Sequence, residues 1–170
     1  RDVIKEKNPD LEDAENVARS VGTGAVIFND LMNDRQKNID FDWEKILDFN
    51  GDTGPYVQYT HVRCFSVLSK WKKTIPLQSK ALTTPQEKEV FRILGRFDDI
   101  MKLALEQLKP SWIAQYLLEL SKAFNAFYYE HRILEGDQDL QESRIRLTDS
   151  TRLVLKKGLS LLGIDAPHAM

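Results

Sequence analysis

The stretch GDTGPYVQYTHVR, residues 51–63, decides the fold prediction because it combines a helix start with two distinct helix faces. Gly51 and Gly54 are typical of a turn. Pro55 suits an early helical position, since its fixed φ matches the helix and it has no amide hydrogen to leave unpaired. We therefore predict a helix from Pro55 to about Lys73.

The predicted helix has one face that is suited to binding and one that is suited to packing. Side chains three and four residues apart share a face of a helix. The first face contains Tyr56, Tyr59, Arg63, Ser66 and Lys70, and the mostly apolar second face contains Val57, His61, Cys64, Leu68 and Trp71. Periodicity alone favours half-buried tyrosines with hydroxyls in water over a binding surface.

A longer stretch around this element resembles a known family. Residues 24–63, GAVIFNDLMNDRQKNIDFDWEKILDFNGDTGPYVQYTHVR, closely resemble the segment of arginyl-tRNA synthetases that joins the catalytic domain to the anticodon-binding domain. FNAFYYEHRIL at 124–134 and RLVLKKGLSLLGIDAPHAM at 152–170 resemble the last two helices and the C-terminus of that family. Thr60 and Val62 stand where the family more often has small residues, but neither lies on the tyrosine face.

Amphipathic periodicity predicts five further helices and no strand of useful length. They lie at about 10–33, 41–49, 85–109, 111–134 and 139–162. Gly22 and Gly24 are expected to bend or split the first. Thr84-Pro85-Gln86-Glu87 fits a capping box at the start of the third. The predicted inward positions are Trp43, Ile46, Leu47, Val90, Ile93, Phe97, Ile100, Ala104, Leu108, Ile113, Leu117, Leu120, Phe124, Phe127, Leu134, Leu147, Val154, Leu155, Leu161 and Leu162.

These helices predict an all-α fold, a helical bundle, which is also what the resemblance implies for an anticodon-binding domain. We expect two parts: residues 1–50, a helical linker that contacts the tRNA stem, and residues 51–170, the α-helical anticodon-binding domain. Gly158 inside the last helix indicates close approach of a neighbouring helix, and Gly163 is typical of a helix C-terminus.

The composition is that of an ordinary globular chain, with 42% hydrophobic and 29% charged residues among 170. No run of about 18 apolar residues occurs, so we predict no membrane span. Cys64 is the only cysteine, which excludes an internal disulfide and suits the reducing cytoplasm. The chain begins with Arg1 rather than methionine, which suggests a fragment. The net charge of −2 excludes RNA binding by bulk charge, so binding needs stacking and a local patch.

Catalytic signatures are absent from the sequence. Neither the His-Ile-Gly-His-type nor the Lys-Met-Ser-Lys-Ser-type motif of class I synthetases occurs, and neither does a P-loop. His61, His131 and His168 do not have the spacing of a metal site. We predict that this chain alone is non-catalytic and holds no cofactor. The resemblance implies that the full-length enzyme ligates arginine to tRNA(Arg) using ATP with magnesium.

The resemblance implies that the tyrosine face binds the anticodon loop. Single-stranded RNA loops are recognised by stacking splayed bases on aromatic rings and by hydrogen bonds to base edges. The family's anticodon-facing positions match Tyr56, Tyr59, Arg63, Tyr128 and the terminal Met170, and Asn125 and Arg132 lie on the Tyr128 face of a continuous helix. Alternatives remain for these residues: Tyr128 as a core residue, Met170 as a frayed end, and Arg63 as one half of a surface ion pair.

Other cations have two interpretations each. Arg35 and Lys37 either contact the tRNA body or are simply solvated. The basic residues of the last helix either contact phosphates or form a solvated face; they are Arg144, Arg146, Arg152, Lys156 and Lys157. The tail is expected to pack against the helices that bear Tyr56 and Tyr128, and deleting residues 167–170 is expected to leave stability almost unchanged.

Two other functions are compatible with the helices. One is the bundle of another class I synthetase, such as the cysteinyl enzyme, although the GPYxQYxHxR element argues against it. The other is a helical scaffold that binds a protein partner through apolar faces. We expect the partners to be tRNA(Arg) and the catalytic domain of the same chain, and the protein to be monomeric.

Overall fold

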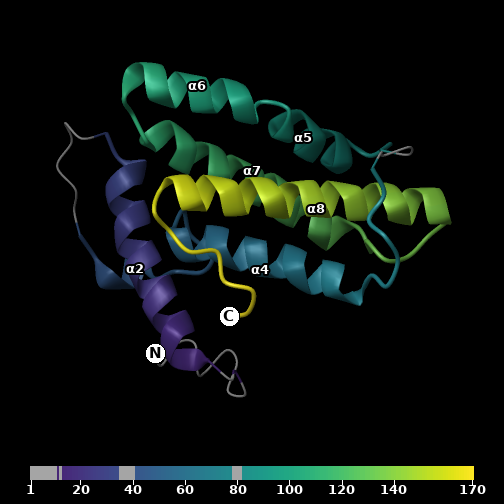
Figure 1. Ribbon diagram of the computed structural model, residues 1–170, viewed down its shortest axis with the longest axis horizontal. Helices are drawn as coiled ribbons and strands as arrows, with labels where there is room; N and C mark the ends of the chain where they lie inside the picture. Colours follow the sequence, from purple (N-terminus) through teal and green to yellow (C-terminus); the bar gives the residue numbers. More distant parts are fainter. Residues whose placement is uncertain (1–10, 12, 35–40, 78–81) are drawn as a thin grey trace.

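The computed structural model describes residues 11, 13–34, 41–77 and 82–170, and these form helices and connecting segments without a strand (Figure 1). The predicted all-α class is confirmed. The helices of the described residues are α2 (Ala14–Met32), α3 (Trp43–Ile46), α4 (Gly54–Lys70), α5 (Pro85–Leu94), α6 (Phe97–Gln107), α7 (Ser111–Glu130) and α8 (Gln138–Leu161).

The long helices lie side by side, and the first one crosses their end. Figure 1 shows α4 and α8 antiparallel in front of α7, with α5 and α6 along the upper edge and α2 crossing at the left. Close packing joins α4 to α8, α7 to both α5 and α8, and α2 to both α4 and α7. The C-terminal tail, yellow in Figure 1, leaves α8 and runs across α4.

The main hydrophobic core lies between these helices. Each large apolar side chain that it buries contributes roughly 1.5–3 kcal/mol relative to an exposed one. The core combines residues from α2, α4, α5, α7 and α8 that are at most 1% exposed, including Phe28, Val57, Ile93, Leu117, Phe124 and Leu155. The predicted apolar face of α4 is confirmed, because Val57, His61 and Cys64 are fully buried and Leu68 and Trp71 half-buried.

Two glycines allow helices to approach closely. The split expected as one possibility at Gly22 and Gly24 does not occur, since α2 continues through both. A Cβ on Gly54 would lie 2.8 Å from the Gly24 carbonyl oxygen, so α2 and α4 can cross this closely only because residue 54 has no side chain. A Cβ on Gly158 would lie 2.5 Å from Leu117 Cδ2, which confirms the predicted close contact of α8 with its neighbour.

The start of α5 matches the sequence prediction. The Thr84 hydroxyl accepts a hydrogen bond from the Glu87 amide at 3.3 Å, and the Glu87 carboxylate accepts one from the Thr84 amide at 3.0 Å. Two amides at the beginning of the helix are thereby satisfied, as a capping box requires.

The helix predicted for 85–109 is two helices. Gly95 has a low helix propensity, and the Arg96 amide bonds to the Ile93 carbonyl three residues back at 3.0 Å, which tightens the chain into a turn. Asp98 then lies in the first turn of α6, where a negative charge is favourable.

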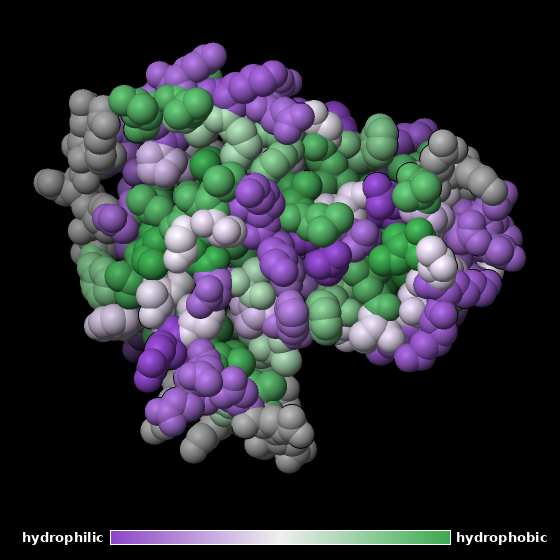
Figure 2. Space-filling view, viewed as in Figure 1, coloured by the Kyte–Doolittle hydropathy of each residue, from purple (hydrophilic) through white to green (hydrophobic). Residues whose placement is uncertain are grey.

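Several predicted inward positions are at the surface instead. Leu108 follows the last turn of α6, has a left-handed backbone (φ 53°) and is 67% exposed. Figure 2 shows apolar residues at the surface over this end of α6. Trp43 is 59% exposed because α3 is a single turn and buries only Ile46, with Leu47 half-buried beyond it. Leu161 is also exposed, at the last residue of α8.

Candidate nucleic-acid interface

The first face of α4 is at the surface, as its spacing predicts. Tyr56, Tyr59 and Arg63 are each half-buried, while Ser66 and Lys70 further along the same face are exposed. Thr53 fixes the start of this helix by accepting a hydrogen bond from the Tyr56 amide at 3.2 Å. The helix ends at Lys70, three residues earlier than predicted, because Trp71 is extended.

The guanidinium of Arg63 is surrounded by three tyrosine rings. Its Cζ lies 5.0 Å from the ring centroid of Tyr59 on its own helix, and 4.7 and 4.9 Å from those of Tyr128 and Tyr129 on α7. A guanidinium within about 6 Å of a ring is attracted by the ring's negative face, by roughly 0.5–1 kcal/mol at an exposed site. We call these residues, together with Asn125, the Arg63 cluster.

Hydrogen bonds fix the position of this guanidinium. Nη1 donates to Oδ1 of Asn125, and Nη2 donates to the Tyr129 hydroxyl at 3.1 Å. Asn125 is 5% exposed, and its Nδ2 donates to the Thr60 hydroxyl at 2.9 Å. The Thr60 hydroxyl in turn donates to the Tyr56 carbonyl at 2.8 Å. Asn125 therefore positions Arg63 from the buried side and has little exposed surface for a ligand.

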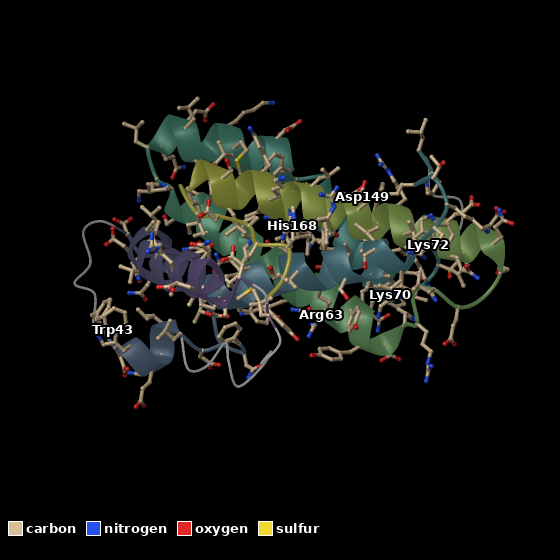
Figure 3. All side chains as sticks on the ribbon, turned by 60° about the horizontal axis from the view of Figure 1, so that its bottom comes forward. Trp43, Arg63, Lys70, Lys72, Asp149 and His168 are labelled. Atoms are coloured by element: carbon tan, nitrogen blue, oxygen red, sulfur yellow. The ribbon has the colours of Figure 1, made fainter. Side chains whose placement is uncertain are left out.

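The ion-pair alternative for Arg63 is not what the structure has. Arg63 pairs with no carboxylate of the described residues, and its neighbours are rings, an amide and a hydroxyl. The guanidinium in Figure 3 lies beside α4, where it is held between the two helices. No carboxylate of the described residues therefore neutralises its positive charge.

Sequence reasoning missed Tyr129 and the support from Thr60. Tyr129 is 75% exposed and has the most accessible ring of the cluster. It lies four residues after Asn125 and therefore on the same face of α7, and this spacing could have predicted that Tyr129 belongs to the site. Thr60 lies off the tyrosine face, yet its hydroxyl reaches the cluster through Asn125.

Tyr56 and Tyr128 combine two environments. Both pack against the hydrophobic core and remain half-buried, so each has a buried side and a surface side. The ring of Tyr128 also lies 6.4 Å from that of Phe124 inside the bundle. The core interpretation of Tyr128 thus holds for its inner side, while Arg63 lies over its ring at the surface.

Arg132 is apart from this cluster. The prediction placed it one helical turn after Tyr128, but α7 ends at Glu130 and the turn does not exist. Its side chain pairs with Glu135 at 3.1 Å and is 82% exposed, and its carbonyl accepts a hydrogen bond from Arg144 at 3.3 Å. Helical spacing fails here because it was extended past the helix end.

The C-terminal tail is bound along α4. Gln58 Nε2 donates to the Asp165 carbonyl at 2.8 Å, and His61 Nδ1 donates to the Pro167 carbonyl at 2.9 Å. The His168 ring stacks on Phe65 with centroids 4.5 Å apart and planes 3° from parallel. The predicted packing of the tail on the helix that bears Tyr56 is confirmed.

Met170 ends beside the Arg63 cluster. It packs with Tyr59 against a small apolar cluster whose buried members are Val21 and Phe49. The rings of Phe49 and Tyr59 meet edge to face at 6.2 Å. The last residue therefore packs against the same small cluster as Tyr59 and is not a frayed end.

Burial changes the acidity of two α4 side chains. Desolvation lowers the pKa of His61 to about 4, although the bond to the Pro167 carbonyl favours the charged form; nearby Arg152, His168 and Lys156 lower it further. Desolvation also raises the pKa of the fully buried Cys64 thiol well above its usual value. A neutral imidazole and a protonated core thiol fit a structural role and not nucleophilic catalysis.

The basic residues of α8 are mostly engaged within the bundle. Arg144 is 8% exposed and its Nε donates to the Glu87 carboxylate at 2.8 Å, so the suggested phosphate contact is wrong for this residue. Arg146 and Arg152 pair with Asp149, at 3.8 and 2.6 Å. Lys156 and Lys157 are exposed. Arg35 and Lys37 lie outside the described residues.

Within the described ranges, no group of three His, Cys, Asp or Glu side chains is arranged to hold a metal ion. No helix in the same part of the chain is long and apolar enough to cross a membrane. The Arg63 cluster remains the site with the most distinctive chemistry.

A family model decides the relationship, since the DALR anticodon binding domain matches residues 57–170, which include all of α4 after its first turn and all of α5 to α8. The chain belongs to the DALR anticodon-binding domain family. The arginyl-tRNA synthetase resemblance is also confirmed. The chain is 44% identical over 171 residues to arginine–tRNA ligase of Clostridium beijerinckii, and 45% identical over 172 residues to that of Halothermothrix orenii.

These relatives are much longer than this chain. It is covered over 99% and 100% of its own length, but it spans only 30% of theirs. Solved structures agree with the fold. Arginyl-tRNA synthetase of Thermus thermophilus matches 99% of this chain and 30% of its own at a TM-score of 0.89 with 39% identity. That of Plasmodium falciparum has a TM-score of 0.87 over the whole chain at 24% identity and supports the fold alone.

Proposed function

We propose that the Arg63 cluster binds the anticodon loop of tRNA(Arg) as part of an arginyl-tRNA synthetase. The observation that supports this most directly is the Arg63 guanidinium held between Tyr59, Tyr128 and Tyr129, with no carboxylate partner among the described residues. Aromatic rings and an arginine plane are the surfaces on which unpaired bases stack, and stacking is worth roughly 1–3 kcal/mol per base.

The roles within the cluster follow from exposure. Tyr129 and the surface sides of Tyr59 and Tyr128 offer stacking area, and Arg63 offers hydrogen-bond donors to a base edge or a phosphate. Asn125 positions Arg63, and Met170 adds apolar contact area beside Tyr59. Arg132 is the weakest member of the predicted set, since its charge is paired with Glu135.

The remaining roles are those of the longer protein. We propose that the whole protein ligates arginine to tRNA(Arg) with ATP and magnesium, in the cytoplasm and as a monomer. In this proposal residues 51–170 are the anticodon-binding domain, and residues 1–50 are a linker that contacts the tRNA stem and the catalytic domain. This chain alone would neither aminoacylate tRNA nor catalyse arginine-dependent pyrophosphate exchange, because it lacks the class I signatures.

A titration with anticodon stem-loop RNA tests the proposal. We expect the chain to prefer the stem-loop of an arginine tRNA over that of a non-cognate tRNA. Tyr59→Ala and Tyr129→Ala should each weaken binding by roughly 1–3 kcal/mol with little change in salt dependence. Phe91→Ala is the matched control, because Phe91 is also a 62% exposed aromatic residue but lies on α5. Equal affinity in all three variants would refute the proposal.

A further inference from the structure

A surface groove lies next to the Arg63 cluster, between the end of α4 and the segment that follows α7. Tyr129 lines the groove and also belongs to the cluster, so the two are continuous. The other side chains that matter for its chemistry are Val67, Lys70, Arg132 and Glu135. A ligand held by the cluster could therefore extend into the groove.

The α4 side of the groove is basic in a chain that is slightly acidic. Residues 53–86 contain no Asp or Glu, although the chain has 26 of them among 170 residues. The same stretch contains Arg63, Lys70, Lys72 and Lys73. Figure 3 shows Arg63, Lys70 and Lys72 following one another along α4 and past its end. The positive charges thus form a row that begins at the cluster.

These lysines have no carboxylate partner in the part of the chain that the structure describes. Lys72 Nζ donates to the Ser69 carbonyl at 3.3 Å, and Lys73 Nζ lies 5.3 Å from the Trp71 ring centroid. Several cations elsewhere in the described residues are paired; these include Arg92 and Arg96 with Glu119, Lys109 with Asp34, and Lys122 with Asp52. A favourable interaction with the negative end of the α4 dipole explains a cation in its last turn, but not two further lysines beyond it.

Arg132 does not supply the positive charge on the opposite wall. It is paired with Glu135 at 3.1 Å, and both residues line the groove, so this wall is close to neutral. The positive charge of the groove therefore lies on its α4 side, at Lys70, and Lys72 and Lys73 extend this charge beyond the groove lining. An extended anion that runs along α4 fits this arrangement better than a compact anion held from both sides.

We propose that this groove binds the phosphate backbone of the RNA strand that leaves the Arg63 cluster. The inference rests on the proposed function and adds a second element of recognition to it. Lys70 lies two helical turns, about 10 Å, beyond Arg63 along α4, which is within reach of the nucleotides that flank those on the rings. Lys70, Lys72 and Lys73 would then contribute affinity without sequence preference, whereas the rings contribute the stacking.

The test compares salt dependence in two charge-matched variants. K70Q/K72Q/K73Q removes the lysine row, and K88Q/R92Q/K102Q removes three exposed cations on α5 and α6. With an anticodon stem-loop as the probe, the slope of log K against log salt should become about 2–3 units shallower in the first variant and stay near the parent value in the second. Affinity at low salt should fall at least tenfold in the first variant only.

The outcomes separate this inference from the proposed function. Equal slopes in the two variants, with Tyr129→Ala still weakening binding, would overturn the phosphate groove and leave the proposed function standing. Absence of RNA binding by the parent chain would overturn both. Polyglutamate is the last competitor. If it displaces the stem-loop from the parent as efficiently as competing RNA does, but fails to displace it from K70Q/K72Q/K73Q, the lysine row binds acidic protein partners. That result would also overturn the inference.

Discussion

The buried imidazole of His61 donates a hydrogen bond to the carbonyl of Pro167, a residue 106 positions later in the chain. The contact ties the C-terminal tail to the middle of α4, at a residue two positions before Arg63 and on the adjoining face. The stability of the tail and the geometry of the candidate interface are therefore linked through one helix. His61 must be neutral in this environment, since its Nε2 is buried without a hydrogen-bond partner.

The first prediction is a loss of stability between pH 6.5 and about 4. Burial lowers the pKa of His61 from 6.5 to about 4, so the unfolded chain takes up a proton in this range that the folded chain does not. The stabilisation is complete above pH 6.5 and is lost as the pH falls, by roughly 2–3 kcal/mol at pH 4. Urea unfolding at several pH values measures it.

The control for this prediction is His61→Asn, which retains an amide donor near the position of Nδ1 but does not titrate. Its unfolding free energy should depend less on pH in this window. Glu87 titrates in the parent and in His61→Asn alike, so it does not account for a difference between their pH profiles. Burial raises the pKa of its carboxyl, but hydrogen bonds from Thr84, Thr83 and Arg144 lower it more, so its contribution is lost only below about pH 4.5. An unchanged pH profile in His61→Asn would contradict the assignment.

The second prediction concerns deletion of residues 167–170. From the sequence, the deletion was expected to leave stability almost unchanged, but the tail binds His61 and stacks on Phe65. Losing one buried hydrogen bond and this packing should cost roughly 2–4 kcal/mol. Met170→Ala keeps both contacts and should cost less than about 1 kcal/mol, yet weaken stem-loop binding. Thermal unfolding and RNA titration of both variants distinguish packing from recognition.

The third prediction separates positioning from contact in the Arg63 cluster. Asn125→Ala removes the acceptor for Arg63 and the partner of Thr60, so it should weaken stem-loop binding about tenfold and lower stability by roughly 1–3 kcal/mol. Because the substitution removes no positive charge, the salt slope should change little.

Matched variants make this prediction sharper. Ser121→Ala, one turn earlier on α7, removes a buried hydroxyl that has no hydrogen-bond partner and should be neutral or stabilising. Thr60→Ala places a small residue at a position where the family more often has one, and should produce a weaker form of the Asn125→Ala effect. If Asn125→Ala binds RNA like the parent, Arg63 is held by the tyrosines alone.

The sequence predicted the parts of the site that lie on one helix and missed those that depend on how helices meet. Local spacing was enough for the tyrosine face of α4 and for the capping box at Thr84. The Arg144–Glu87 pair joins residues 57 positions apart and depends on the packing of α5 against α8, which local spacing does not predict. Arg132 was misplaced because periodicity does not show where a helix ends, and the end of α7 has neither glycine nor proline to signal it.

The fourth prediction tests the other helix end that periodicity misjudged. Leu108 has a φ of 53°, in the left-handed region that costs residues with a Cβ roughly 1–2 kcal/mol, and its side chain is 67% exposed. Leu108→Gly should therefore stabilise the protein by roughly 0.5–1 kcal/mol, which urea unfolding would detect as a higher midpoint at constant m. Leu105→Gly is the matched control, since Leu105 is 74% exposed but lies within α6. It should destabilise by about 1 kcal/mol, because glycine loses more backbone freedom in a helix. Destabilisation of similar size in both variants would mean that the Leu108 side chain contributes packing that outweighs the cost of its backbone conformation.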